Sequence, residues 1–257
     1  MFRNLEIWLN HFEYHAEHPR RVPAGLSDIL KPEERRLIAR SISTFQLGEQ
    51  SDGSALLRSA VRFGEKHDVK SLARIFELFI REEQRHATLL REFMADHDLP
   101  LKQTDWTDFV FCCLRRVGRL ELRLHVFITA ELIATTYYRA LEVATGCQRL
   151  KVLCRTLVAD ELAHIGLQSQ LFLTLRGRRS PPAQAAVRLL HRVFFFSTAS
   201  VVYLTHRAVL RSAGYDLGGF LRTCSMQHAF HLEPPSMKRA LPASRTASLD
   251  PGTPHSF

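Results

Sequence analysis

The chain lacks the cysteine and glycine motifs that mark many redox proteins. Its five cysteines form no Cys-x-x-Cys pair, which excludes a rubredoxin-type iron domain within the chain and argues against a disulfide framework. No Rossmann glycine fingerprint is present either, so the sequence predicts no dinucleotide site of that kind. Reduced thiols without a disulfide pattern are typical of a cytosolic protein.

Long apolar segments are also missing. The first six residues contain no apolar signal core, and the most apolar run, Val193–Leu204, is too short to span a bilayer. Hydrophobic residues make up 46% of the 257 positions and charged residues 24%, which is ordinary for a chain with a substantial core. We therefore expect a soluble cytoplasmic protein with no membrane span.

The positive charge has no single focus. The formal net charge is +9, but the arginines are spread along the chain, and the densest run is Arg-Gly-Arg-Arg at 176–179. A dispersed excess favours acidic partners or anionic surfaces. No nucleic-acid recognition motif accompanies it, so nucleic acid is not an expected partner. The sequence leaves open a homodimer.

Helical periodicity dominates the chain, and no strand pattern of useful length appears. Proline and glycine punctuation predicts an all-α fold with helices over about 2–17, 32–66, 69–97, 118–145, 147–175 and 181–213. This order predicts an N-terminal amphipathic helix and turn (1–31), a four-helix bundle (32–176), a C-terminal helical extension with the fifth bundle-associated helix (177–232), and a loosely ordered tail (233–257) rich in Pro, Ser and Thr.

Two Glu-x-x-His pairs are the most informative motif. Each is preceded in the chain by a lone glutamate, so that six candidate metal ligands follow in the order Glu49, Glu83, His86, Glu131, Glu161, His164. Two helices with one Glu each and two with Glu-x-x-His are the ligand set of a carboxylate-bridged di-metal centre in a four-helix bundle. One such pair would carry little weight, whereas the ordered set is a strong signal.

The positions of these residues along the predicted helices support the set. Glu49, Glu83 and Glu161 fall near the middle of their helices, so antiparallel packing would place them at one level. Glu131 reaches that level only if its helix starts near 118–120. Residues 98–117 are then a long crossover between helix pairs, with room for a short helix over 105–116.

The chemistry of the set suits a pair of divalent ions. Residues i and i+3 share a helix face, so each Glu-x-x-His can bind one ion. Two imidazoles and four carboxylates favour two iron ions, with manganese or a mixed pair as alternatives. Glu82 and Asp160 precede the two pairs directly and are candidates to accept the second N–H of the histidines.

The motifs Glu-Glu-Gln-Arg-His (82–86) and Asp-Glu-Leu-Ala-His (160–164) resemble those of the ferritin-like di-iron superfamily. That group includes acyl-carrier-protein desaturases, monooxygenase hydroxylases, aldehyde-deformylating oxygenases, rubrerythrins and ribonucleotide reductase small subunits. The resemblance implies a ferritin-like bundle over 32–176 in which the six residues bind iron. It also implies active-site roles for Thr135 and Tyr138, although a helical Thr often bonds only a backbone carbonyl and a helical Tyr is often core.

Two positions depart from members of the superfamily. Leu90 stands where the reductase small subunit carries its radical tyrosine, and Ala134 stands where rubrerythrins carry a further glutamate. The resemblance implies an oxidoreductase that uses dioxygen on an organic substrate. Phe45, Phe79 and Leu90 favour a hydrophobic one, and the missing glycine and cysteine motifs predict electrons from a separate ferredoxin or reductase. A ferroxidase or peroxide scavenger, and a non-catalytic metal-binding protein, are the alternatives.

Three histidines of the N-terminal helix form an additional pattern. His11, His15 and His18 are spaced i, i+4 and i+7, which suits either a surface metal site or a solvated helix flank. The sequence favours the solvated flank.

Overall fold

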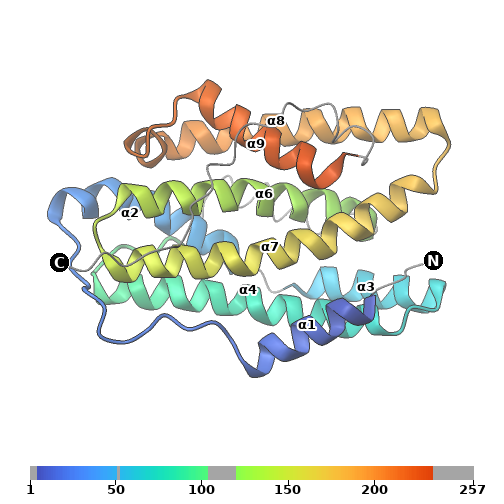
Figure 1. The fold of residues 1–257 in the computed structure, drawn as a ribbon, viewed down its shortest axis with the longest axis horizontal. Coiled ribbons are helices and arrows are strands. Elements are labelled where there is room, and N and C mark those ends of the chain that lie inside the picture. Colours follow the sequence, from blue (N-terminus) through green and yellow to red (C-terminus); the bar gives the residue numbers. More distant parts are fainter. Residues whose placement is uncertain (1–4, 51–52, 104–119, 234–257) are drawn as a thin grey trace, which may run out of the picture.

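The computed structural model describes residues 5–50, 53–103 and 120–233, and these ranges are helical with no strand. The predicted all-α class is confirmed. The helices are α1 (Leu5–Glu17), α2 (Pro32–Glu49), α3 (Ser54–His67), α4 (Ser71–Asp96), α6 (Leu120–Ala144), α7 (Gln148–Gly177), α8 (Pro181–Ser212) and α9 (Leu217–Leu232) (Figure 1).

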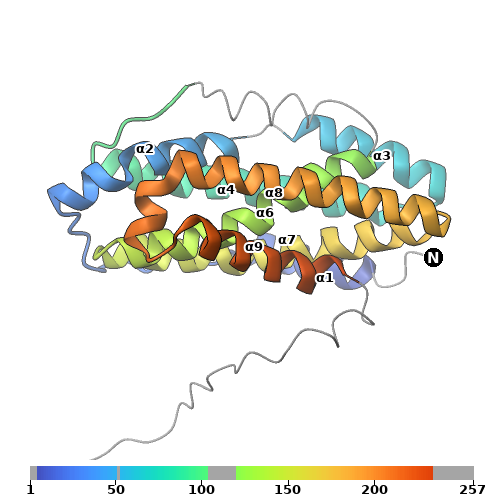
Figure 2. The ribbon, with the colours of Figure 1, turned by 90° about the horizontal axis from the view of Figure 1, so that it is seen from above.

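One predicted helix is wrong. The pattern over 32–66 predicts a continuous helix, but the structure has α2 and α3 in its place, one after the other along the same side of the molecule (Figure 2). Gly53 precedes α3 with a φ of 63°, and a Cβ there would lie 2.6 Å from the side chain of Ile80. Glycine is therefore required at this break. As a result Glu49 ends α2 instead of lying at mid-helix.

The remaining predicted helices agree with the structure to within a few residues. The extension after α8 contains a further helix, α9, which begins at Leu217 after the N-cap Asp216; the Asp216 carboxylate accepts a hydrogen bond from the Gly219 N–H at 2.5 Å. Residues 98–103 are non-helical, as a crossover requires. The possible helix over 105–116 and the predicted tail after residue 233 lie outside the described residues.

The helices form three layers (Figure 1). α6 and α7 are the most extensively paired helices; α4 packs against α2, α3 and α7, while α8 lies over α6 and α2, and α9 packs on α6, α7 and α8. α1 lies along α4 on the opposite side. Gly166 in α7 allows this approach, because a Cβ there would clash with the ring of Trp8 in α1.

The core of the bundle is divided into two apolar clusters. One contains Phe79 of α4 and Phe127 of α6, and the other contains Leu90 and Ala134 of the same helices. Between Phe79 and Leu90 the α4 sequence carries acids and a histidine, and between Phe127 and Ala134 α6 carries Glu131. The polar residues therefore occupy a layer between two apolar ones.

α8 is the most apolar of the outer helices. By length and composition it could cross a membrane, and 39% of its most apolar window is buried inside the protein. Leu189, Leu190 and Val193 are more than half exposed on it. A helix of this kind is weak evidence for a span, so the expected absence of one stays a prediction.

Candidate metal centre

The polar layer brings the six candidate ligands together. They form two groups in which one nitrogen or oxygen atom of each residue lies within 4.8 Å of those of the others: Glu49, Glu83, His86 and Glu161, and Glu83, Glu131, Glu161 and His164. The two groups share Glu83 and Glu161. Two ions bridged by carboxylates need an arrangement of this kind, because the bridging residues must reach both ions.

Both histidines point the same ring nitrogen at the carboxylates. His164 Nδ1 lies 3.0 Å from Glu83 Oε1 and 3.2 Å from Glu161 Oε2. His86 Nδ1 lies 3.3 Å from Glu161 Oε1 and 3.6 Å from Glu83 Oε1. Each Glu-x-x-His pair is spaced i, i+3 on its helix, which explains why its histidine and glutamate face the same volume.

The other ring nitrogens face a second pair of acids. His86 Nε2 lies 3.2 Å from Asp160 Oδ2, and His164 Nε2 lies 3.0 Å from Glu82 Oε2. Each acid thus contacts the histidine of the opposite helix. A carboxylate on Nε2 fixes the tautomer in which Nδ1 carries the free lone pair, which is the form that binds a metal.

Asp160 is held by two arginines that the sequence analysis did not identify. Arg20, from the segment after α1, and Arg85, inside the first motif, both donate to its carboxylate. Asp160 itself is fully buried. Burial alone raises the pKa of Asp160, but His86 and the guanidinium groups lower it well below its ordinary range. Asp160 is therefore an anion on the outer side of His86.

The inner carboxylates differ in charge when no metal is bound. Burial and the neighbouring carboxylates of Glu83 and Glu161 raise the pKa of Glu49 well above its ordinary value. Burial also acts to raise the pKa of Glu161, but the imidazoles of His164 and His86 hold it at about 2. Burial lowers the pKa of His86, yet Asp160 and the inner carboxylates raise it to about 10. In the metal-free centre, protons on the histidines and on Glu49 therefore offset part of the carboxylate charge.

Two atoms of the centre lack a well-formed hydrogen bond. Glu83 Oε1 and His86 Nδ1 are buried and make none within the described part of the chain, although they lie 3.0 Å from His164 Nδ1 and 3.3 Å from Glu161 Oε1. Buried polar atoms with poorly formed hydrogen bonds are costly. Both atoms face the space between the two groups, and both are of types that bind divalent iron or manganese. The donor set and its orphaned atoms therefore fit a pair of metal ions.

Thr135 and Tyr138, the two tentative catalytic residues, differ in their contacts. The Tyr138 hydroxyl donates to Glu49 Oε1 at 2.7 Å, which ties this buried tyrosine directly to the centre. The Thr135 hydroxyl donates to the Leu132 carbonyl at 2.9 Å. This is the backbone bond that a helical threonine often makes.

The sequence analysis also missed Gln168. Its amide donates to Glu131 Oε1 at 3.1 Å, and the residue is fully buried. Gln168 follows His164 by four residues and Glu161 by seven, so it shares their helix face. That spacing was the signal that could have identified it.

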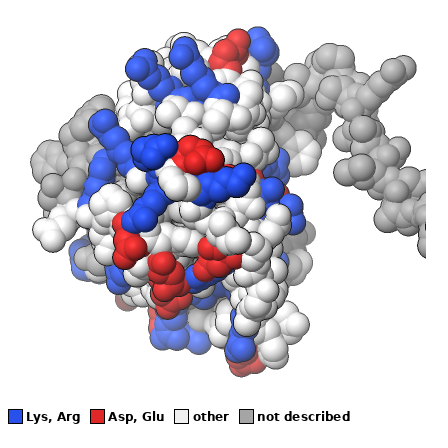
Figure 3. Space-filling model, turned by 90° about the vertical axis from the view of Figure 1, so that its left-hand side faces the viewer, with Lys and Arg blue, Asp and Glu red and all other residues white. Residues whose placement is uncertain are grey.

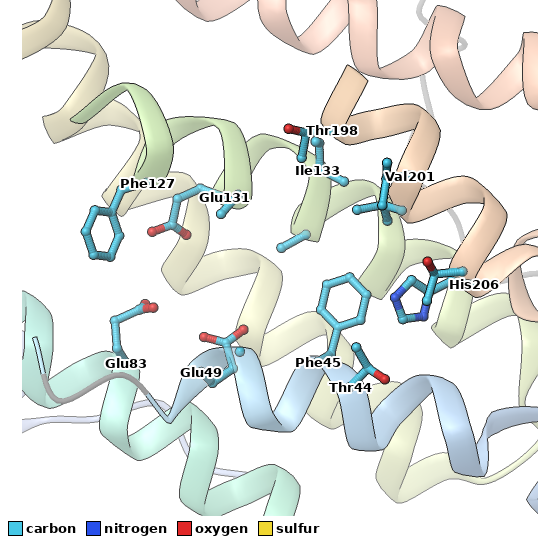
Figure 4. A pocket seen from close by; sticks show the side chains of 15 residues that line it. Thr44, Phe45, Glu49, Glu83, Phe127, Glu131, Ile133, Thr198, Val201 and His206 are labelled. Atoms are coloured by element: carbon cyan, nitrogen blue, oxygen red, sulfur yellow. The ribbon is translucent and has the colours of Figure 1, made fainter. Parts of the chain in front are cut away.

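A cavity of about 110 Å³ reaches the centre from the α8 side. The carboxylates of Glu49, Glu83 and Glu131 point into it from three helices, and Phe45 stands between them and His206 (Figure 4). Most of the remaining lining is apolar, including Phe127, Ile133, Ala134, Val201 and Val202. The absence of a glutamate at 134 leaves part of this space open.

The α1 histidines do not form one solvated set. His18 is exposed and its Nδ1 lies 3.2 Å from the Tyr14 carbonyl, but His11 and His15 are partly buried with their rings 4.3 Å apart. His15 lies close to Glu82 and Asp160. The predicted solvated flank therefore holds for His18, while the other two face the bundle.

Comparisons of the chain with family models, with curated proteins and with solved structures found no match, so the resemblance to the ferritin-like di-iron superfamily rests on the residues of this centre alone.

Proposed function

We propose that the chain is a di-iron carboxylate protein of ferritin-like architecture that uses dioxygen to oxidise an organic substrate. The observation that carries this proposal is the pair of overlapping ligand groups, which share Glu83 and Glu161 and receive the Nδ1 atoms of both histidines. Glu49 and Glu131 complete one group each. Each group contains three glutamates and one histidine. This matching composition supports two ions of the same kind, with manganese as an alternative to iron.

When bound, a pair of iron ions supplies the reducing electrons and the open positions that dioxygen needs. The chain's own residues do the rest. Asp160 and Glu82 hold the histidine rings in the orientation that presents Nδ1. The apolar walls of the cavity exclude water from the carboxylate side, and Phe127, Ile133 and Val201 leave room there for a small apolar group.

Electrons for the centre must come from another protein. Neither a Rossmann glycine fingerprint nor a Cys-x-x-Cys pair is present in the sequence, so the chain carries no motif for a flavin, nicotinamide or iron–sulfur relay of those kinds. A separate ferredoxin or reductase fits this role. The positive net charge of the chain suits an acidic donor.

Metal analysis of the purified protein, followed by optical spectra as the reduced form meets dioxygen, tests the proposal. We expect about two iron ions per chain, and a reaction with dioxygen that a bound organic molecule accelerates. Rapid consumption of dioxygen or peroxide without any organic molecule would instead indicate a ferroxidase or peroxide scavenger. Stable metal with no redox reaction would indicate a non-catalytic protein.

Two variants test the assignment of the centre itself. Glu83→Ala and Glu161→Ala remove the two residues that both groups share. Each should lose iron while the helical circular dichroism signal is kept. Stoichiometric iron in both variants would refute the centre. Glu92→Ala, on the same helix as Glu83 but exposed, is the matched control and should retain iron.

A further inference from the structure

The cavity at the centre is the inner part of a longer groove between α2 and α8. A second hollow of about 440 Å³ adjoins it, and both are lined by Thr205 and His206. The α2 residues that line the outer hollow are Leu37, Arg40 and Ser41. Those that line the inner cavity are Thr44, Phe45, Gly48 and Glu49. These residues recur every three or four positions, so they form one continuous stripe on α2.

α8 supplies the opposite wall and runs antiparallel to α2, so that its later residues line the outer hollow and its earlier residues line the inner cavity. Its residues 204–209 line the outer hollow, and its residues between 198 and 206 line the inner cavity. α2 and α8 contact each other directly. The two hollows therefore follow one another along α2 and α8, with the outer one nearer the ends where α2 begins and α8 ends (left in Figure 1) and the inner one at the carboxylates. Arg40 precedes Glu49 by nine residues, which is about 13 Å along the helix.

The α8 backbone is irregular where the two hollows meet. His206 has φ −110° and ψ 17°, outside the helical range, and it is buried. Its Nδ1 lies 2.8 Å from the Ser41 hydroxyl, which also lies 2.8 Å from the Tyr137 hydroxyl. This hydrogen-bonded trio holds the wall of the groove at the break, so the groove is a supported feature of the fold.

The outer hollow is positively charged. Among the residues that the structure describes, Arg40 and Arg207 line it and no acid does. Both arginines are exposed, and neither forms an ion pair with the acids of residues 5–50, 53–103 and 120–233. On the end of the molecule toward which the groove opens, Lys and Arg side chains predominate in the upper part, where α8 and α9 lie (Figure 3). A ligand that follows the groove therefore meets cations outside and apolar walls inside.

We propose that the α2–α8 groove binds an elongated organic anion. Its carboxylate or phosphate group lies at Arg40 and Arg207, and its apolar end lies in the inner cavity beside Glu49 and Glu131. This inference rests on the proposed function in one respect. It takes the apolar end of the ligand to be the part of the substrate that lies at the metal centre. A neutral apolar molecule would make no charge contact with either guanidinium group and would leave both to solvent.

Calorimetric titration of the full chain with sodium octanoate, octyl phosphate and 1-octanol tests the charge requirement. We expect an anion to bind about fivefold or more tightly than the alcohol, since two partly exposed charge contacts contribute modestly. The double variant Arg40→Gln/Arg207→Gln should lose this preference. The control Arg36→Gln/Arg211→Gln changes exposed arginines of the same helices outside the groove and should keep it. Comparison of octanoate with octyl phosphate identifies the anionic group.

A second variant tests the inner end. Ala134→Leu adds volume to the inner cavity, and it should shift the best-bound carboxylate from octanoate to the shorter hexanoate. Equal binding of octanoate and octanol, no binding of either, or an unchanged preference in Arg40→Gln/Arg207→Gln would overturn the inference.

Iron content separates this inference from the proposed function. The two arginines do not belong to the ligand groups, so the double variant should hold as much iron as the parent chain. Arginine-dependent octanoate binding in a chain that holds no iron would support the groove and refute the di-iron function. A chain that holds iron but does not bind octanoate would support the di-iron function and refute the groove as an anion site.

Discussion

Glutamine substitutions at Glu49 and Glu161 should change the stability of the metal-free protein in opposite directions. Both residues are buried carboxyls of the same centre. Burial and the carboxylates of Glu83 and Glu161 raise the pKa of Glu49 well above its ordinary value and favour its protonated form, whereas Glu161 has a pKa of about 2 and is an anion between two imidazoles. Glutamine resembles the protonated acid, so it reproduces the state of Glu49 and removes the charge of Glu161.

The expected gain in folding stability for Glu49→Gln follows from proton linkage. The folded-state pKa lies above its ordinary value of 4.5, so above that pH the unfolded chain loses a proton that the folded chain retains, and folding is disfavoured. Glu49→Gln abolishes this penalty and can still accept the hydrogen bond of Tyr138. Each unit of pKa displacement corresponds to about 1.4 kcal/mol. We expect a gain of about 1 kcal/mol or more at pH 7 that disappears below pH 4.5.

Glu161→Gln should instead lower the folding stability. Its folded-state pKa is depressed, so its contribution is fully present above pH 4.5 and is lost as the pH falls toward 2. Glu161→Gln leaves the buried imidazolium groups of His86 and His164 without a central anion. Removing one partner of a buried ion pair typically costs about 3–5 kcal/mol, and we expect a loss in that range at pH 7.

Urea unfolding of chelator-treated protein, followed by circular dichroism at pH 7 and pH 4, measures both effects. Iron analysis after reconstitution should show weaker binding in both variants, which demonstrates that metal affinity and apoprotein stability separate at Glu49. Equal destabilisation by the two substitutions, or a larger loss for Glu49→Gln, would refute the charge assignment.

Three further substitutions test neighbouring contacts. Asp160→Asn should weaken iron binding about 10–100-fold in a chelator competition, because the outer partner of His86 loses its charge; unchanged affinity would show that the contact is structural only. Gly166→Ala should destabilise the chain by about 1–3 kcal/mol and alter tryptophan fluorescence, since its Cβ meets Trp8, whereas Gly177→Ala, with open space around it, should do neither. Tyr138→Phe should cost about 1–2 kcal/mol in urea unfolding through the lost buried hydrogen bond; no loss would mean that the bond is not formed in solution.

Helical periodicity explains why spacing was sufficient to find the centre. Glu83 with His86 and Glu161 with His164 are one helical turn apart, so the sequence alone requires each pair to share a face. Their convergence with Glu131 is consistent with the packing of long neighbouring helices, but Glu49 reaches them from the last residue of the shorter α2, which the mid-helix argument did not predict. The same periodicity failed over 32–66, because a pattern of apolar residues continues across Gly53 although the backbone there is left-handed. The Asp-Gly-Ser at 52–54 signalled this break.

Tertiary packing supplies what spacing could not. Arg20 reaches Asp160 from a non-helical segment 140 residues earlier in the chain, and no local pattern predicts such a contact. His206 likewise forms the wall of the α2–α8 groove only because α8 folds back over α2. Nothing in its sequence context distinguishes it from the buried His191 of the same helix.

The charges of the polar layer support two divalent ions independently of the ligand geometry. Six carboxylates lie in or beside the layer: Glu49, Glu82, Glu83, Glu131, Asp160 and Glu161. Arg20 and Arg85 offset two of them, which leaves four negative charges, the number that two divalent ions neutralise. Without metal, protons on His86, His164 and Glu49 offset three of these four charges. Loading with two ferrous ions should therefore release about three protons at pH 7, measurable by titration calorimetry in buffers of different ionisation enthalpy; no proton release would contradict the charge balance.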